Sequence, residues 1–382
     1  MNNSTCLGKS FEKDVFMREI LEETDSEKLF LVKKKYSICP LCMNLYGCFS
    51  ITNIIFGNYY FMIPILTEEE REEILTHIKR YSVKKDNFHI LTDVDDTIMT
   101  SSLGGTNVKY NTNHTVYPGV ESFYKNLVST SFVTLLSARP EAISPSSRGK
   151  VSVAIGNIPV DMLTGKVSDI ISLGLAKIGT YATRDFSYPN SLQHIDGTQP
   201  IGWYNKYVNM GTTKYESILK YVQIYPELNF IFIGDSGQGD LICAYKIQEE
   251  LKRDKNFPVK ASFIHNIIKL KELTHYESGA AKSINDLLMI NNKAFIKNLK
   301  KKSIFIFNNY IDLAGYTSCL NIINSAKLNS IITDTLADFN ENKKQKIYYQ
   351  TPLYISYIEN DLNNSAEKWM DKEAKSKLCN LG

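Results

Sequence analysis

The 382-residue chain carries little net charge and few cysteines, and both shortages exclude classes of protein. Its 44 basic and 41 acidic side chains leave a formal net charge of +3, whereas a dedicated nucleic-acid binder shows a basic stripe. An aromatic fraction of 11% and the low charge also argue against an intrinsically disordered chain. This length is enough to bury a full core, and we expect two or three structural units and no nucleic-acid partner.

The seven cysteines are odd in number and scattered, so they do not resemble a disulfide framework. We therefore expect a reducing compartment, in which thiols stay reduced. Cys39 and Cys42 form a CxxC, but no second ligand pair follows, which favours reduced cysteines over a zinc site. The first 14 residues contain charged side chains and no apolar run, unlike a secretory signal. These features predict a cytoplasmic protein.

Residues 36–67 contain no charged side chain and follow three lysines, Lys33 to Lys35. Proline, glycine and asparagine interrupt the apolar residues, so the stretch does not resemble a transmembrane helix of about 20 apolar residues. Gly57 and Asn58 predict a turn between two short buried strands. The alternative is a peripheral membrane contact, because lysines suit an anionic lipid surface.

Acidic residues follow a predicted strand within the segment 89–97, which reads His-Ile-Leu-Thr-Asp-Val-Asp-Asp-Thr. Asp93 and Asp95 are two positions apart, so a loop can direct both carboxylates to one point. One could act as a nucleophile and the other as a general acid and then base. Both would attract Mg²⁺, which prefers hard oxygen ligands. Acidic turns are also common at strand ends, and this segment alone leaves both interpretations open.

Two more apolar runs end in polar residues. Residues 131–136 lead to Ser137 and Arg139, whose hydroxyl and guanidinium groups could bind a phosphoryl group; the alternative for Ser137 is a helix cap. Residues 229–233 lead to Asp235 and Asp240, which could complete an oxygen-rich metal site. Ligands of open α/β sheets bind at the carboxyl ends of strands, where these residues are expected.

Lys214 begins a predicted helix that extends to residue 225 and has apolar side chains at helical spacing. A lysine at a helix start is slightly disfavoured by the helix dipole. That cost suggests a role in holding an anion, whereas the alternative is an ordinary surface lysine.

These four elements, in this order, resemble the motifs of the haloacid dehalogenase (HAD) superfamily of phosphotransferases. The closer resemblance is to the catalytic domain of the actin-patch phosphatidate phosphatase family, and the lipins resemble the chain more distantly. The segments that carry it are Asp93 to Thr97, Tyr117-Pro118-Gly119, Lys214 and Gly234 to Gln238. One departure is Ser137-Ala138-Arg139-Pro140, where the family shows Ser-Asn-Ser. Another is the long stretch before Lys214, which predicts a small cap.

The resemblance implies a role for each matched residue. Asp93 would attack phosphorus, and Asp95 would protonate the leaving oxygen and then activate water. Ser137 and Lys214 would hold the phosphoryl group. Arg139 lies where the chain departs from the family, so the resemblance implies no role for it and leaves the substrate-side contacts open. The implied Mg²⁺ ligands are Asp93, Asp235 and the backbone carbonyl of Asp95, with Asp240 close by.

The predicted fold is α/β, a three-layer doubly wound parallel sheet of the HAD-like Rossmannoid type. A further strand is expected at residues 259–264. We expect an N-terminal extension over 1–85 that is strand-rich or membrane-contacting, a catalytic domain over 86–282, and a mostly helical C-terminal extension over 283–382 whose role the sequence does not indicate.

The expected function is Mg²⁺-dependent phosphomonoester hydrolysis through an aspartyl-phosphate, with phosphatidate as the suggested substrate. Two alternatives stay open: a catalytically inactive lipid- or phosphate-binding module, and a soluble phosphatase for a small metabolite or a phosphoprotein. The presence of Asp95 favours an enzyme, because a module that only binds is expected to lack the acid-base residue.

Overall fold

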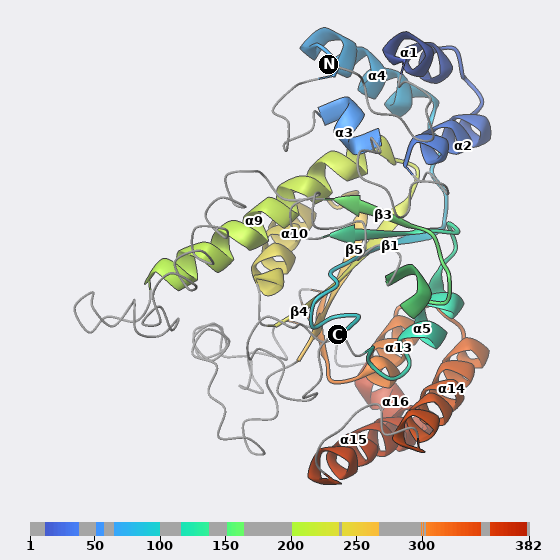
Figure 1. The fold of residues 1–382 in the computed structure, drawn as a ribbon, viewed down its shortest axis with the longest axis vertical. Coiled ribbons are helices and arrows are strands. Elements are labelled where there is room, and N and C mark those ends of the chain that lie inside the picture. Colours follow the sequence, from blue (N-terminus) through green and yellow to red (C-terminus); the bar gives the residue numbers. More distant parts are fainter. Residues whose placement is uncertain are drawn as a thin grey trace.

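A sheet of six parallel strands, in the order β3-β2-β1-β4-β5-β6, forms the centre of the computed structural model (Figure 1). The strands are β1 (Phe88–Thr92), β2 (Val133–Leu136), β3 (Val160–Leu163), β4 (Asn229–Asp235), β5 (Val259–His265) and β6 (Ile304–Phe307). The structure describes residues 12–37, 51–56, 65–99, 116–136, 151–163, 201–236, 239–266, 299, 301, 303–344 and 352–379.

Helices cover both faces of this sheet (Figure 1). One layer contains α1 (Lys13–Leu21), α2 (Ser26–Ser37), α3 (Ile51–Phe56), α4 (Glu68–Tyr81), α9 (Ile201–Ile224) and α10 (Asp240–Arg253). The other contains α5 (Val120–Leu127), α13 (Tyr310–Cys319), α14 (Ser325–Lys344), α15 (Pro352–Met370) and α16 (Lys372–Cys379). We call them the N-terminal layer and the C-terminal layer, after the ends of the chain that supply most of their helices.

β1, β2, β4, β5 and β6 contribute side chains to both layers because successive side chains of a strand point to opposite faces. In β4, Phe230 and Phe232 belong to the core of the N-terminal layer, whereas Ile231 and Ile233 belong to that of the C-terminal layer. A parallel sheet that is covered on both faces reads as continuous apolar runs, which explains why the strands were visible in the sequence.

The predicted α/β class and parallel sheet are confirmed. The strands expected at residues 89–92, 131–136, 229–233 and 259–264 correspond to β1, β2, β4 and β5. Two further strands were not predicted. β3 lies at one edge, and β6 lies at the other, beyond the predicted catalytic segment, where it pairs with β5.

The prediction of a strand pair in the uncharged stretch is wrong for residues 51–56, which form helix α3. The physical reason is the spacing of Ile51, Ile54 and Ile55, which places all three on one helical face in the N-terminal core. Gly57, Asn58 and the CxxC cysteines lie outside the described residues. Within the described ranges, no helix combines the length and hydropathy needed to cross a membrane.

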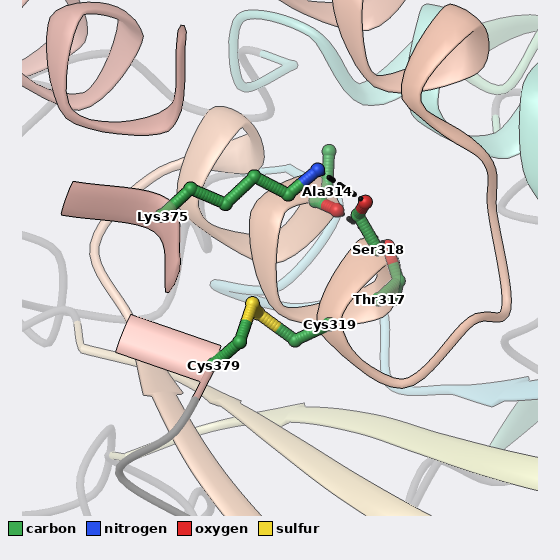
Figure 2. The surroundings of a disulfide bond; sticks show 6 residues. All are labelled: Ala314, Thr317, Ser318, Cys319, Lys375 and Cys379. Carbon is green, nitrogen blue, oxygen red and sulfur yellow. Dashed lines mark hydrogen bonds between the residues drawn. A yellow bond between two sulfur atoms is a disulfide. The ribbon is translucent and has the colours of Figure 1, made fainter. Parts of the chain in front are cut away.

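A disulfide joins Cys319 at the end of α13 to Cys379 at the end of α16 (Figure 2). The two Cα atoms lie 5.1 Å apart although 60 residues separate them in the sequence. Beside this bond, the Lys375 ammonium donates a hydrogen bond to the Ser318 hydroxyl at 3.0 Å (Figure 2). The structure therefore corrects the expectation of a wholly reduced chain, whereas Cys243 is a buried free thiol.

Candidate active site

The acidic loop of residues 93–99 begins where β1 ends and is held next to β4. The Asp93 amide donates a hydrogen bond to the Ile233 carbonyl at 2.9 Å. Further along, the Asp96 amide donates to the Met99 carbonyl at 2.7 Å, and Asp96 has a φ of 58°, in the left-handed region. A short turn therefore reverses the chain directly after Asp93 and Asp95, both of which are buried.

The turn after β4 brings Asp235 and Asp240 together. α10 begins at Asp240, and the Asp240 Oδ2 atom accepts a hydrogen bond from the Asp235 amide at 3.1 Å. A Cβ atom at Gly234 would overlap the Asp240 carboxylate, so this position requires glycine. Gly239 has a φ of 93°, which L side chains rarely adopt.

Lys214 lies inside α9, which begins at Ile201, and not at a helix start as predicted. The helix dipole therefore does not bear on Lys214, because its effect is confined to the first and last turns. The position of the ammonium group explains the residue instead. Its Nζ atom lies 3.0 Å from Asp93 Oδ1 and also pairs with Asp240 Oδ1.

Three carboxylates converge at this lysine. One oxygen from each of Asp93, Asp235 and Asp240 lies within 4.8 Å of the others, and all three residues are buried. The Asp93 Oδ2 atom is buried with no hydrogen-bond partner among the described residues. Buried carboxylate oxygens without protein donors are suitable ligands for a hard divalent cation, so the residues fit the predicted Mg²⁺.

The electrostatics of the cluster indicate an excess of negative charge. Burial, then the nearby Asp240 and Asp93 carboxylates, raises the pKa of Asp235 well above its ordinary value. Burial likewise raises the pKa of Asp240 to about 7, although Lys214 acts in the opposite direction. Burial alone would lower the pKa of Lys214, but the carboxylates of Asp240, Asp93 and Asp235 raise it overall. A divalent cation would neutralise this excess and favour the ionised acids.

The remaining predicted site residues have different outcomes. Asp95 is buried in the same loop, but its carboxylate is not one of the three that converge. Ser137 and Arg139 lie outside the described residues, so their predicted roles are untested. β2 ends at Leu136, beside β1, at the same edge of the sheet as the acids.

Two side chains that the sequence left unassigned also reach the acidic loop. His265, the last residue of β5, hydrogen-bonds the Asp96 carbonyl through Nδ1 at 2.8 Å. Tyr310, the first residue of α13, donates its hydroxyl to the Thr97 carbonyl at 3.1 Å. A polar residue at the carboxyl end of a strand was a usable signal for His265. No sequence signal indicated Tyr310, because only the tertiary packing of α13 brings it to the loop.

Comparison of the chain with protein-family models, curated proteins and solved structures finds no match. The geometry of the carboxylates and Lys214 and the motif resemblance are therefore the observations that bear on function.

Proposed function

We propose that the chain is a Mg²⁺-dependent phosphomonoesterase of the HAD type that works through an aspartyl-phosphate. The observation that carries this proposal is the convergence of Asp93, Lys214, Asp235 and Asp240, which come from the loop after β1, α9, β4 and α10. The motif resemblance supports the proposal, because these are the residues that it matches to the HAD nucleophile, lysine and metal-binding acids. A structural role alone would not favour three buried acids around one lysine, because burial of unbalanced charge is costly.

The proposed reaction has two displacements. A carboxylate oxygen of Asp93 attacks phosphorus, the ester P–O bond breaks, and Asp95 protonates the leaving oxygen. Asp95, now ionised, takes a proton from water, whose oxygen attacks the aspartyl-phosphate, and the Asp93–phosphorus bond breaks to release phosphate. Lys214 neutralises charge on the phosphoryl oxygens throughout. When bound by Asp93, Asp235 and the Asp95 carbonyl, with Asp240 close by, Mg²⁺ would supply further charge stabilisation.

Phosphatidate is the substrate that the motif resemblance favours, and such an enzyme would meet a membrane surface peripherally. The predicted cytoplasmic location is a separate proposal. The disulfide between Cys319 and Cys379 weighs against it, because disulfides persist mainly in oxidising compartments.

The test of activity uses an aryl phosphate such as p-nitrophenyl phosphate with Mg²⁺. Wild-type protein should release phosphate, and Asp93→Asn should abolish release because the amide is not a nucleophile. Asp254→Asn is the matched control, since Asp254 is an exposed residue just after α10 and should retain wild-type turnover. Absence of turnover by the wild type across a panel of phosphomonoesters would instead favour a phosphate-binding module.

The substrate class is tested separately. Phosphatidate in mixed vesicles is compared with soluble sugar phosphates at equal phosphate concentration. Turnover of the vesicle substrate supports the lipid assignment. If vesicle phosphatidate is untouched while a soluble ester is hydrolysed, the lipid assignment is wrong and the phosphatase assignment stands.

A further inference from the structure

Side chains from distant parts of the chain hold the backbone of the acidic loop. The Thr92 hydroxyl, at the end of β1, donates to the carbonyl of the adjacent Asp93 at 2.9 Å. The Val94 carbonyl accepts amides of the loop itself. The carbonyls of Asp96 and Thr97, in contrast, are bonded by the side chains of His265 and Tyr310, which lie 169 and 213 residues away. The segments β5 and α13 thus determine where the loop lies.

Both distant donors are buried and closely packed. His265 and Tyr310 are each 1% exposed. The His265 ring stacks on Phe307 at 4.9 Å between centroids and meets Tyr117 edge-on at 4.7 Å. The Tyr310 ring contacts Phe123 at 5.5 Å. Packed aromatic rings have little rotational freedom, so each donor is held in one position relative to its carbonyl.

The loop needs such support because its backbone is not in a relaxed conformation. A left-handed residue other than glycine costs about 1 kcal/mol or more and persists only where its surroundings require it. At Asp96, the amide is bonded to Met99 and the carbonyl is bonded to His265, so both backbone groups are constrained. Loss of either bond would free the turn that directs Asp93 and Asp95.

We propose that His265 and Tyr310 are positioning residues, which hold the carbonyls of Asp96 and Thr97 and thereby orient the Asp93 and Asp95 carboxylates toward the cation and the phosphoryl group. The inference rests on the proposed function for its kinetic consequence, and on the carboxylate cluster alone for its effect on cation binding. It also assigns a role to α13, in the C-terminal segment whose role the sequence did not indicate.

Other residues of the C-terminal layer in turn hold α13 in place. Asn309 caps its first turn by accepting the amides of Ile311 and Asp312, both at 3.1 Å. The buried Asp312 carboxylate accepts the Trp369 indole N–H at 2.8 Å, and the disulfide at Cys319 holds the other end. The contact between Tyr310 and the loop is therefore part of a rigid unit that includes α15 and α16.

The experiment removes each donor while keeping the ring volume or the hydrogen-bonding capacity. Tyr310→Phe deletes only the hydroxyl. His265→Leu deletes the donor to Asp96, whereas His265→Asn retains an N–H near the Nδ1 position. Tyr221→Phe is the matched control, because its buried hydroxyl accepts a hydrogen bond from Thr134 of β2 and its ring packs in the N-terminal core. The measurements are Mg²⁺ affinity by calorimetry, kcat and KM for the aryl phosphate, and Tm.

We expect Tyr310→Phe and His265→Leu to weaken Mg²⁺ binding or lower kcat by about ten- to hundredfold, as for other outer-shell partners of metal ligands. KM should change less, His265→Asn should recover part of the loss, and Tyr221→Phe should resemble the wild type in kcat and affinity. Wild-type affinity and kcat in both donor deletions, measured well below their Tm, would overturn the inference and leave the phosphatase proposal intact.

The experiment also distinguishes the positioning role from the phosphatase proposal when the wild type shows no activity. If the wild type binds Mg²⁺ but hydrolyses nothing, a weakened affinity in the donor deletions supports the positioning role although the phosphatase proposal fails. If the wild type does not bind Mg²⁺, the positioning role is overturned together with the metal site.

Discussion

Two buried lysines illustrate how differently this protein surrounds the same side chain. Lys33 in α2 is 0% exposed, and its Nζ atom lies 2.6 Å from Glu227 Oε1 and 3.0 Å from the Ile224 carbonyl. Lys214 in α9 is 3% exposed and faces the carboxylates of Asp93 and Asp240. Both belong to the same layer, yet one meets a single acid and the other lies in a cluster of three.

The number of acids reverses the direction of the pKa shift. Burial lowers the pKa of Lys33 to about 8, and the Glu227 carboxylate offsets only part of that effect. Burial acts in the same direction on Lys214, but Asp240, Asp93 and Asp235 raise its pKa overall. Burial of a lysine therefore does not by itself mark a candidate site, whereas an excess of acids around it does.

The largest expected effect concerns stability. Lys33→Met should lower the free energy of unfolding by about 3–5 kcal/mol, because Glu227 would be left as a buried, uncompensated charge. Phosphatase activity of the folded protein should not change. Lys33→Met combined with Glu227→Leu should recover most of the loss, since an apolar pair of similar volume needs no charge compensation. Urea denaturation measures all three proteins, and equal stability of single and double variants would contradict this account.

At Lys214, the same substitution should reduce activity, whereas at Lys33 it should reduce stability. Lys214→Met should lower kcat by about 10²–10³-fold, because in the proposed mechanism it removes the cation that stabilises charge on the phosphoryl group. Steady-state hydrolysis of an aryl phosphate measures the effect, with Lys33→Met as the control. Comparable turnover by the two variants would show that the cluster of acids does not distinguish a functional lysine.

The pH dependence of stability should separate Lys33 from an ordinary lysine. Its folded pKa of about 8 lies below the ordinary 10.5, so between these values the unfolded chain holds a proton that the folded chain has released. The contribution of Lys33 to the free energy of unfolding should therefore rise with pH over this window, by about 3 kcal/mol in total. The difference in stability between wild type and Lys33→Met, measured from pH 7 to 11, should increase; a flat difference would contradict the lowered pKa.

The smallest expected effect is the stabilisation of the folded protein by Mg²⁺. Mg²⁺ at about 100 times its Kd should add about 2.7 kcal/mol to the free energy of unfolding, because it binds only the folded protein. Lys33→Met should show the same increment, and Asp235→Asn should lose most of it. Thermal denaturation with and without Mg²⁺ provides the measurement, and an increment unaffected by Asp235→Asn would place the cation elsewhere.

Much of the core was predictable because a parallel sheet covered on both faces requires apolar strands. The acids after β1 and β4 were expected to meet, since parallel strands end at one edge of the sheet. β3 was missed because Asp161 interrupts its apolar residues, and β6 because a four-residue apolar run is not distinctive. α3 was mistaken for a strand because a short apolar run does not show its period clearly until the neighbouring helices are known.

At the site, the identities of Asp93, Lys214, Asp235 and Asp240 followed from residue types and motif spacing. The interior position of Lys214 in α9 did not, because the preceding helical turns have no distinctive pattern. Tyr310 and the bond between Cys319 and Cys379 were beyond sequence reasoning, since contacts between residues so distant in the chain depend on how whole layers pack.

The amino-acid sequence by itself thus determined the strands and the acids at their ends, because local hydropathy and chain direction are encoded residue by residue. Only the tertiary structure decided which side chains support those acids. Neither His265 nor Tyr310 has a local reason to bond a particular carbonyl. Their positions follow from closing two helical layers over one sheet, which brings the end of β5 and the start of α13 against the loop after β1.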